Sequence, residues 1–208
     1  MKHRFAYIAA LLALSSGAVY AQDTAMSFFV TSVNPGKGGD LGGLAGADAY
    51  CNTLATAAGS TGKTWKAYLS TDAENAKDRI GSGPWYNAKG EKIADDVASL
   101  HSDKNNLTKQ TALSEKGAVI NGRGDTPNRH DMLTGSKADG TAAPETCGNW
   151  TMGGEDGVAI VGHSDRTGLN DSAEAKSWNS SHPTRGGCTV KAFNGTGGDG
   201  LFYCFASN

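Results

Sequence analysis

The chain has 208 residues, of which 38% are hydrophobic and 19% are charged, and its formal net charge is −2. Its 29 glycines are about twice the ~7% share that is usual in globular proteins, which favours one domain rich in loops. The near balance of acidic and basic residues lacks the basic excess that binding to a phosphate backbone requires, so nucleic acid is a poor candidate partner.

The first residues have the pattern of a secretory signal peptide. Lys2 and Arg4 precede an apolar run over residues 5–14, and Val19-Tyr20-Ala21 has small residues where a signal peptidase cleaves. We expect residues 1–21 to be removed, giving a secreted or periplasmic protein. The run is shorter than a bilayer-crossing helix requires, and no later apolar run is long enough, so we expect no membrane span. An uncleaved membrane anchor is the weaker alternative.

Export changes how the cysteines are interpreted. An oxidising compartment favours two disulfides among the four cysteines, and these four permit three different pairings. Their spacing contains no C-x-x-C and no histidine at a ligand distance, which disfavours a structural zinc site. The residues are Cys51, Cys147, Cys188 and Cys204.

The N-terminal half alternates between predicted strands and helices. Residues 28–31 are aromatic and β-branched and precede a turn, which predicts a first strand. Apolar residues at helical spacing over residues 44–58 predict an amphipathic helix that ends at Gly59 and turns Cys51 toward the core. Further predictions are a strand over residues 64–69, a helix opened by a Thr71/Glu74 capping box and ending at Ile80, and a short helix carrying Ile93, Val97 and Leu100.

The C-terminal half contains two long polar segments between short apolar ones. Residues 101–131 and 162–187 predict surface loops, and a loop as long as the second is usually functional or disordered. Within the first segment only residues 117–120 predict a short strand. Further short strands are predicted over residues 132–134, 150–151, 158–161 and 201–205. Short mixed elements of this kind are typical of an α+β domain.

Several segments together resemble the endostatin domain. They are Leu41 to Cys51 (LGGLAGADAYC), Thr64 to Ser70 (TWKAYLS), Thr134-Gly135-Ser136, Cys147 to Trp150 (CGNW) and Leu201 to Cys204 (LFYC). The end of the chain is also similar to exported bacterial proteins described as lectins. The resemblance implies that residues 22–208 form one C-type-lectin-like domain, with two short helices packed on mixed antiparallel sheets and with long polar loops. It also implies nested disulfides, Cys51 with Cys204 and Cys147 with Cys188.

The second polar loop is the strongest candidate for a ligand site. Its amide, carboxylate and guanidinium groups could satisfy sugar hydroxyls, and an aromatic face could pack against a pyranose ring. Alternatively, Asp165 and Arg166 pair with local backbone and Trp178 belongs to the core. The candidate ligand-binding residues are His163, Asp165, Arg166, Asn170, Asp171, Trp178, Asn179, His182 and Arg185.

Metal cofactors are not expected from the family motifs. The Glu-Pro-Asn and Gln-Pro-Asp triplets that hold calcium in many C-type lectins are absent, and Trp178-Asn179-Ser180 lacks the acid of the Trp-Asn-Asp motif. Calcium remains possible through oxygen donors at Asp165, Asn170, Asp171 and Asp199, although a solvated loop is the favoured interpretation. The N-terminal histidines that bind zinc in endostatin have no counterpart in residues 22–32.

The sequence favours binding over catalysis. It contains no nucleophile elbow, no H-E-x-x-H and no P-loop, and Asp95-Asp96 is better explained as a helix start than as a glycosidase pair. We therefore predict a non-catalytic carbohydrate-binding protein whose partner is a glycan or glycoconjugate. The alternative is a protein-binding or matrix-adhesion module with an extracellular protein partner, since a fold alone does not fix function.

Overall fold

The computed structural model describes residues 25–208, so the expected signal peptide and the mature start at Gln22 lie outside the described residues. The described chain is a mixture of helices and mixed sheets, which confirms the α+β class. Its elements in order are β1 (Phe28–Val30), α1 (Gly43–Ala57), β2 (Trp65–Ala67), the 3-10 helix η1 (Ala76–Asp78), β3 (Trp85–Tyr86), β4 (Lys92–Ala94), α2 (Val97–Leu100), β5 (Asp131–Leu133), α3 (Cys147–Trp150), β6 (Ile160–His163), β7 (His182–Pro183), α4 (Val190–Asn194) and β8 (Gly198–Ala206).

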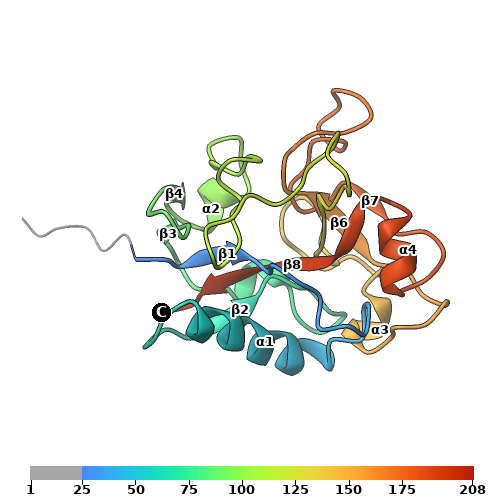
Figure 1. The fold of residues 1–208 in the computed structure, drawn as a ribbon, viewed down its shortest axis with the longest axis horizontal. Helices are drawn as coiled ribbons and strands as arrows, with labels where there is room; N and C mark the ends of the chain where they lie inside the picture. The colour runs from blue at the N-terminus through green and yellow to red at the C-terminus, as the bar shows by residue number, and fades with distance from the viewer. Residues whose placement is uncertain (1–24) are drawn as a thin grey trace, which may run out of the picture.

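The last strand, β8, lies at the centre of the main sheet (Figure 1). It pairs antiparallel with β1 and β2 near the end of the chain, and parallel with β5 nearer its start. The sheet continues from β5 to β6 and then to β7 through antiparallel pairs. A separate two-stranded sheet joins β3 to β4. Strands from both ends of the described chain therefore meet on β8.

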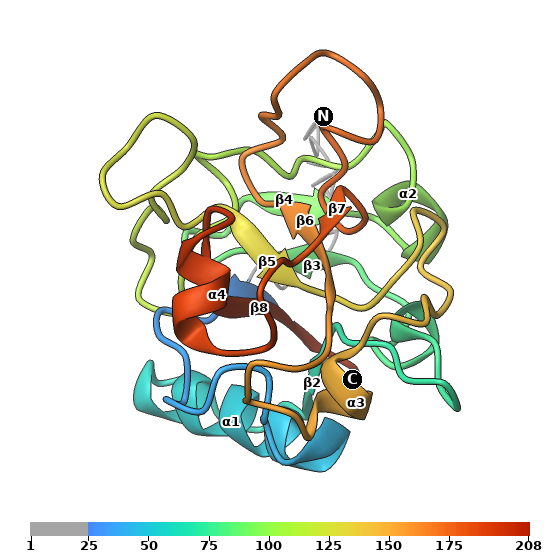
Figure 2. The same ribbon diagram turned by 90° about the vertical axis from the view of Figure 1, so that its right-hand side faces the viewer.

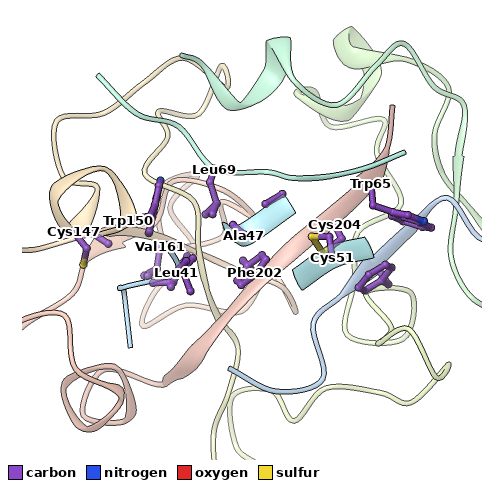
Figure 3. Close-up of a cluster of buried hydrophobic side chains, with 14 of the residues drawn as sticks. Leu41, Ala47, Cys51, Trp65, Leu69, Cys147, Trp150, Val161, Phe202 and Cys204 are labelled. Atoms are coloured by element: carbon purple, nitrogen blue, oxygen red, sulfur yellow. A yellow bond between two sulfur atoms is a disulfide. The ribbon is translucent and has the colours of Figure 1, made fainter. Parts of the chain in front are cut away.

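Both faces of β8 are buried, which explains why its sequence is a continuous apolar run. Phe202 and Cys204 belong to one hydrophobic cluster, which includes buried residues of α1, while Leu201, Tyr203 and Phe205 belong to a second cluster. Side chains alternate between the faces of a strand, so one strand supplies both clusters. Figure 3 shows the first cluster, with Phe202 and Cys204 on the strand and Cys51 beside them.

Helix α1 confirms the predicted amphipathic helix. Its buried residues Ala47, Cys51 and Ala55 are four positions apart and form one stripe. The helix ends where Gly59 adopts a positive φ of +84°, and the amides of Gly59 and Ser60 donate to the carbonyls of Thr56 and Ala55. This is the Schellman arrangement that favours glycine, as the sequence predicted.

The nested disulfide pairing is confirmed. Cys51 is bonded to Cys204 and Cys147 to Cys188, and the described residues contain no free cysteine. The first bond joins α1 to β8, and the second joins α3 to the segment that leads into α4.

Within residues 25–208, no helix is both long enough and apolar enough to cross a membrane.

Some predicted elements of the N-terminal half are wrong. The Thr71/Glu74 pair does not open an α-helix: Thr71 Oγ1 accepts from the Glu74 amide, but only the 3-10 helix η1 follows. The buried Ser70 hydroxyl instead accepts from the amide of Ala76 and sets that start. Ile93 lies in β4, and α2 begins after Asp96, which forms a capping box with Ser99.

The C-terminal half differs from prediction at two short runs and in its helices. The predicted strand over residues 150–151 is wrong, because Trp150 closes the short helix α3 with a positive φ and donates from Nε1 to the Ser70 carbonyl. Residues 117–120 form only an isolated bridge through Val119, which is 48% exposed. Instead of two short helices, the described chain has one of 15 residues and three of four or five residues.

One partly buried carboxylate connects α1 to its neighbours. Asp48 Oδ1 accepts from Arg79 Nη2 at 2.7 Å and from the Ala67 amide at 2.9 Å, and Asp48 Oδ2 lies 2.9 Å from Lys66 Nζ. The Arg79 side chain is only 4% exposed. Its other carboxylate partner, Glu74, is 48% exposed. Asp48 therefore supplies the better shielded countercharge for a buried guanidinium.

We expect Asp48→Ala to lower the free energy of unfolding by about 3–5 kcal/mol, because it leaves Arg79 buried with a solvent-exposed partner alone. The matched variant Glu74→Ala should cost no more than about 1 kcal/mol, since its ion pair is half exposed. Urea unfolding of the oxidised protein measures both values. Equal losses for the two variants would contradict this assignment.

Candidate functional site

Three neighbouring strands bring a histidine–aspartate cluster together on one face of the sheet. Asp131 of β5 is the direct register partner of His163 of β6. His182 of β7 pairs with Val161, two positions before His163, so both histidines share that face. His130 immediately precedes β5. Figure 2 shows β5, β6 and β7 beside one another, beneath the orange loop that joins β6 to β7.

The three histidines converge on one carboxylate oxygen. Asp131 Oδ1 lies 3.3 Å from Nε2 of His130, 3.4 Å from Nε2 of His163 and 3.7 Å from Nε2 of His182. The side chains of Asp131, His130 and His163 are 2%, 3% and 5% exposed, while that of His182 is 28% exposed. Three of the four side chains are thus buried, and His182 is partly exposed.

The cluster leaves buried polar atoms without hydrogen bonds. Neither carboxylate oxygen of Asp131 has a hydrogen-bond partner among the described residues, and neither does Nε2 of His163. The imidazole nitrogens are close to Asp131, but their directions do not meet hydrogen-bond geometry. A buried polar group that lacks a partner costs free energy, and a buried charge costs more. This concentration of unsatisfied atoms marks the most unusual site in the described structure.

The opposite nitrogen of each histidine has an oxygen acceptor. His130 Nδ1 is 2.9 Å from Asp165 Oδ1, His163 Nδ1 is 2.7 Å from the Ala175 carbonyl, and His182 Nδ1 is 3.0 Å from the Pro183 carbonyl. These acceptors cannot donate, so they favour a proton on each Nδ1. In a neutral ring the lone pair is then on Nε2, the nitrogen nearest Asp131.

A glycine allows the return of the loop against β6. A Cβ at Gly162 would lie 1.9 Å from the Trp178 carbonyl oxygen, so no larger residue fits there. The returning chain also hydrogen-bonds to β6, from the His163 amide to the Ser177 carbonyl and from the Ser181 amide to the Val161 carbonyl. These contacts place His182 beside His163.

A pocket of about 410 Å³ opens over the cluster, with three of the histidines in its wall. Its lining is mainly polar and comes from the segments around residues 123–130, 163–185 and 195–196. The lining residues are Arg123, Asn128, His130, His163, Leu169, Asn170, Ser172, Glu174, Ala175, Ser181, His182, Arg185, Gly195 and Thr196. Four residues singled out from the sequence therefore line one pocket: His163, Asn170, His182 and Arg185.

Asp165 does not line this pocket but hydrogen-bonds to two residues that do, His130 and Arg123. Its side chain is 3% exposed and accepts from His130 Nδ1 and from the amides of Arg123 and Thr167. Burial opposes ionisation of Asp165, but these hydrogen bonds together outweigh it and lower the pKa of the carboxyl. Asp165 thus holds the ring of His130 and the backbone at Arg123.

The remaining predicted residues lie away from this pocket. Arg166, Trp178 and Asn179 border a separate hollow of about 580 Å³, but Trp178 is 4% exposed and packs on Tyr68 and Tyr203 in the core. Buried Asn179 donates to the Tyr68 hydroxyl. Asp171 is exposed and pairs with Lys176 at 2.6 Å. Trp178 is therefore a core residue, which is the alternative to a ligand-binding role given in the sequence analysis.

The oxygen donors considered for calcium are not assembled into one site. Asp165 is engaged with His130, Asp171 with Lys176, and Asp199 with Arg129 and Asn194. Among the described residues, three or more potential metal ligands of the histidine, cysteine and carboxylate types come together only at His130, Asp131 and His163.

Half of the cluster is not among the candidate residues predicted from the sequence. The polar pattern of residues 101–131 predicts a surface loop at His130 and Asp131, yet both are buried. An adjacent histidine and aspartate directly before the apolar run Met132-Leu133 was the available signal.

Comparisons with protein-family models and with curated proteins find no match to this chain.

Asp165 and Asp171 lie in the same loop but differ in burial, so replacing each should affect stability differently. We expect Asp165→Ala to lower the free energy of unfolding by about 2–3 kcal/mol, because three donors lose their acceptor. Asp171→Ala should change it by less than about 0.5 kcal/mol, since its carboxylate is solvated. Chemical denaturation of both variants distinguishes them. If Asp165→Ala is as stable as wild type, Asp165 does not organise the site.

Proposed function

We propose that this protein is an exported, non-catalytic carbohydrate-binding protein with a C-type-lectin-like fold of the endostatin type. The observation that carries the proposal is the 410 Å³ pocket, in which His163, Asn170, His182 and Arg185 come together. Its volume lies within the ~300–1,000 Å³ range of small-molecule sites. The two disulfides are typical of an oxidising compartment, which supports export, and their nested pairing supports the fold assignment.

The chemistry of the pocket suits polyhydroxylated ligands. Asn128 and Asn170 offer both donors and acceptors, Ser181 and Thr196 offer hydroxyls, and Arg185 offers a planar set of donors. Sugar hydroxyls donate and accept together, so a mixed lining of this kind can satisfy them. The proposal is for binding alone: Glu174 is the one carboxylate among the lining residues, whereas glycoside hydrolysis generally uses two.

One feature favours the second candidate, a protein-binding or adhesion module. Leu169 lines the pocket and is 81% exposed, which gives the loop an apolar contact point of the kind that protein interfaces use. A sugar ring could also pack its C–H face on this leucine. Ligand screening therefore has to compare glycans with proteins.

We expect the oxidised protein to bind a defined set of glycans on an array, in competition with free sugar. The double variant Asn170→Ala/Arg185→Ala should lose about 1–3 kcal/mol of binding free energy, because two exposed hydrogen-bonding side chains are removed, with little change in Tm. Asp171→Ala is the matched control, since Asp171 lies in the same loop outside the pocket lining.

A reproducible glycan signal that the double variant retains in full would place the sugar site outside this pocket. Silence on the array together with saturable binding of an extracellular protein, lost in Leu169→Ala, would instead support the adhesion module.

A further inference from the structure

We propose that His130, Asp131, His163 and His182 form a binding site for one divalent transition metal ion, and that this ion is zinc. The inference does not depend on which ligand the pocket takes. It is carried by donor atoms that converge without hydrogen-bonding to one another: the ligand atoms of His130, Asp131 and His163 all lie within 4.8 Å of one another. His182 adds a fourth nitrogen, 3.7 Å from the same aspartate oxygen.

The distances fit a tetrahedral zinc centre. Zinc binds nitrogen and oxygen ligands at ~2.0–2.1 Å, so neighbouring ligands of a tetrahedral ion are about 3.3–3.4 Å apart. The separations from Asp131 Oδ1 to Nε2 of His130 and His163 are 3.3 and 3.4 Å. The separation to Nε2 of His182, 3.7 Å, requires only a small movement of a partly exposed side chain.

The orientation of the rings also fits ligation. Each Nδ1 is held by an oxygen acceptor, on Asp165, Ala175 or Pro183, which leaves the Nε2 lone pair for a metal. Metal-bound histidines nearly always have this second contact to a carboxylate or carbonyl, because it fixes the ring and its tautomer. The His130–Asp165 pair has the carboxylate form of this contact.

A metal explains the unsatisfied atoms better than protonated histidines do. The rings of His130 and His163 are stacked, with centroids 4.2 Å apart and planes 7° from parallel. Two charged rings at this distance would repel each other, although the buried carboxylates Asp131 and Asp165 would offset their charge. Protonation would still leave Asp131 and Nε2 of His163 without a hydrogen bond of acceptable geometry. One divalent cation instead gives a partner to Asp131 and to Nε2 of His163, both of which lack a hydrogen bond.

The ligand set separates zinc from calcium. Calcium takes six to eight oxygen ligands, whereas this cluster supplies three imidazole nitrogens and one carboxylate. Imidazole-rich sites suit zinc and its first-row neighbours, and four ligands in tetrahedral arrangement are typical of zinc. The pocket gives the ion a route from solvent past His182.

The test is metal binding by the oxidised chain after removal of metals with a chelator. We expect one zinc per chain by elemental analysis and calorimetry, with a dissociation constant of about 1 μM or tighter. Zinc should raise Tm by several degrees and calcium should not. Cobalt substitution should give the visible absorption of a four-coordinate nitrogen and oxygen site.

Variants assign the site to these residues. His182→Gln should weaken zinc binding about 100-fold or more while the protein still folds, because His182 lies partly exposed on the sheet edge. His101→Gln is the matched control, since His101 contacts Tyr68 instead of the cluster, and it should bind zinc as wild type does.

Asp131→Asn separates ligation from folding. Without metal this variant should be at least as stable as wild type, because it removes an uncompensated buried charge, and with zinc it should lose the rise in Tm. The proposal is overturned if wild type binds no stoichiometric zinc, if His101→Gln loses zinc as His182→Gln does, or if calcium binds as tightly. These measurements contain no sugar, so their failure would leave the glycan proposal to its own test.

Discussion

Strand β8 is the constraint on which the rest of the structure depends. Its C-terminal part is held between β1 and β2, and its Cys204 is bonded to Cys51 of α1. Its N-terminal part pairs with β5, where Asp131 faces Gly198. A Cβ at Gly198 would lie 2.9 Å from Asp131 Cβ, so the close approach of the two strands needs glycine. The same strand therefore builds the core and fixes where the candidate site begins.

The histidine–aspartate cluster contains buried polar atoms without hydrogen bonds, and the sheet holds these residues in place despite the free-energy cost. Asp131 and His163 lie on paired strands, so backbone hydrogen bonds of the sheet fix their positions independently of side-chain contacts. The loop between β6 and β7 then supplies the backbone acceptor for His163 and delivers His182. Natural proteins commonly keep unsatisfied polar groups where function requires them and compensate elsewhere in the fold. Here the packed faces of β8 and the two disulfides provide that compensation.

The segment from His163 to Arg185, which includes the loop between β6 and β7, has two roles that its composition does not distinguish. One set of its polar residues faces the pocket over the cluster, and Asn170 and Arg185 belong to this set. Another set anchors the loop: Asp165 holds His130, and Asn179 reaches the Tyr68 hydroxyl inside the core. Hydrogen-bonding residues gather in loops for binding and also because the loop backbone needs partners. Only the burial of each side chain separates the two uses.

The sequence by itself determined the α+β class, helix α1 with its glycine end, and most of the strands, because these follow from local periodicity and turn chemistry. Resemblance to a known domain, not spacing, supplied the disulfide pairing that the structure confirms. Tertiary structure alone decided the rest. Trp150 ends a helix instead of a strand, and its indole donates to the carbonyl of Ser70, 80 residues earlier in the sequence. His130 and Asp131 join His163 and His182 through strand register, which no local pattern encodes, since residues far apart in sequence become neighbours only when β5, β6 and β7 pair.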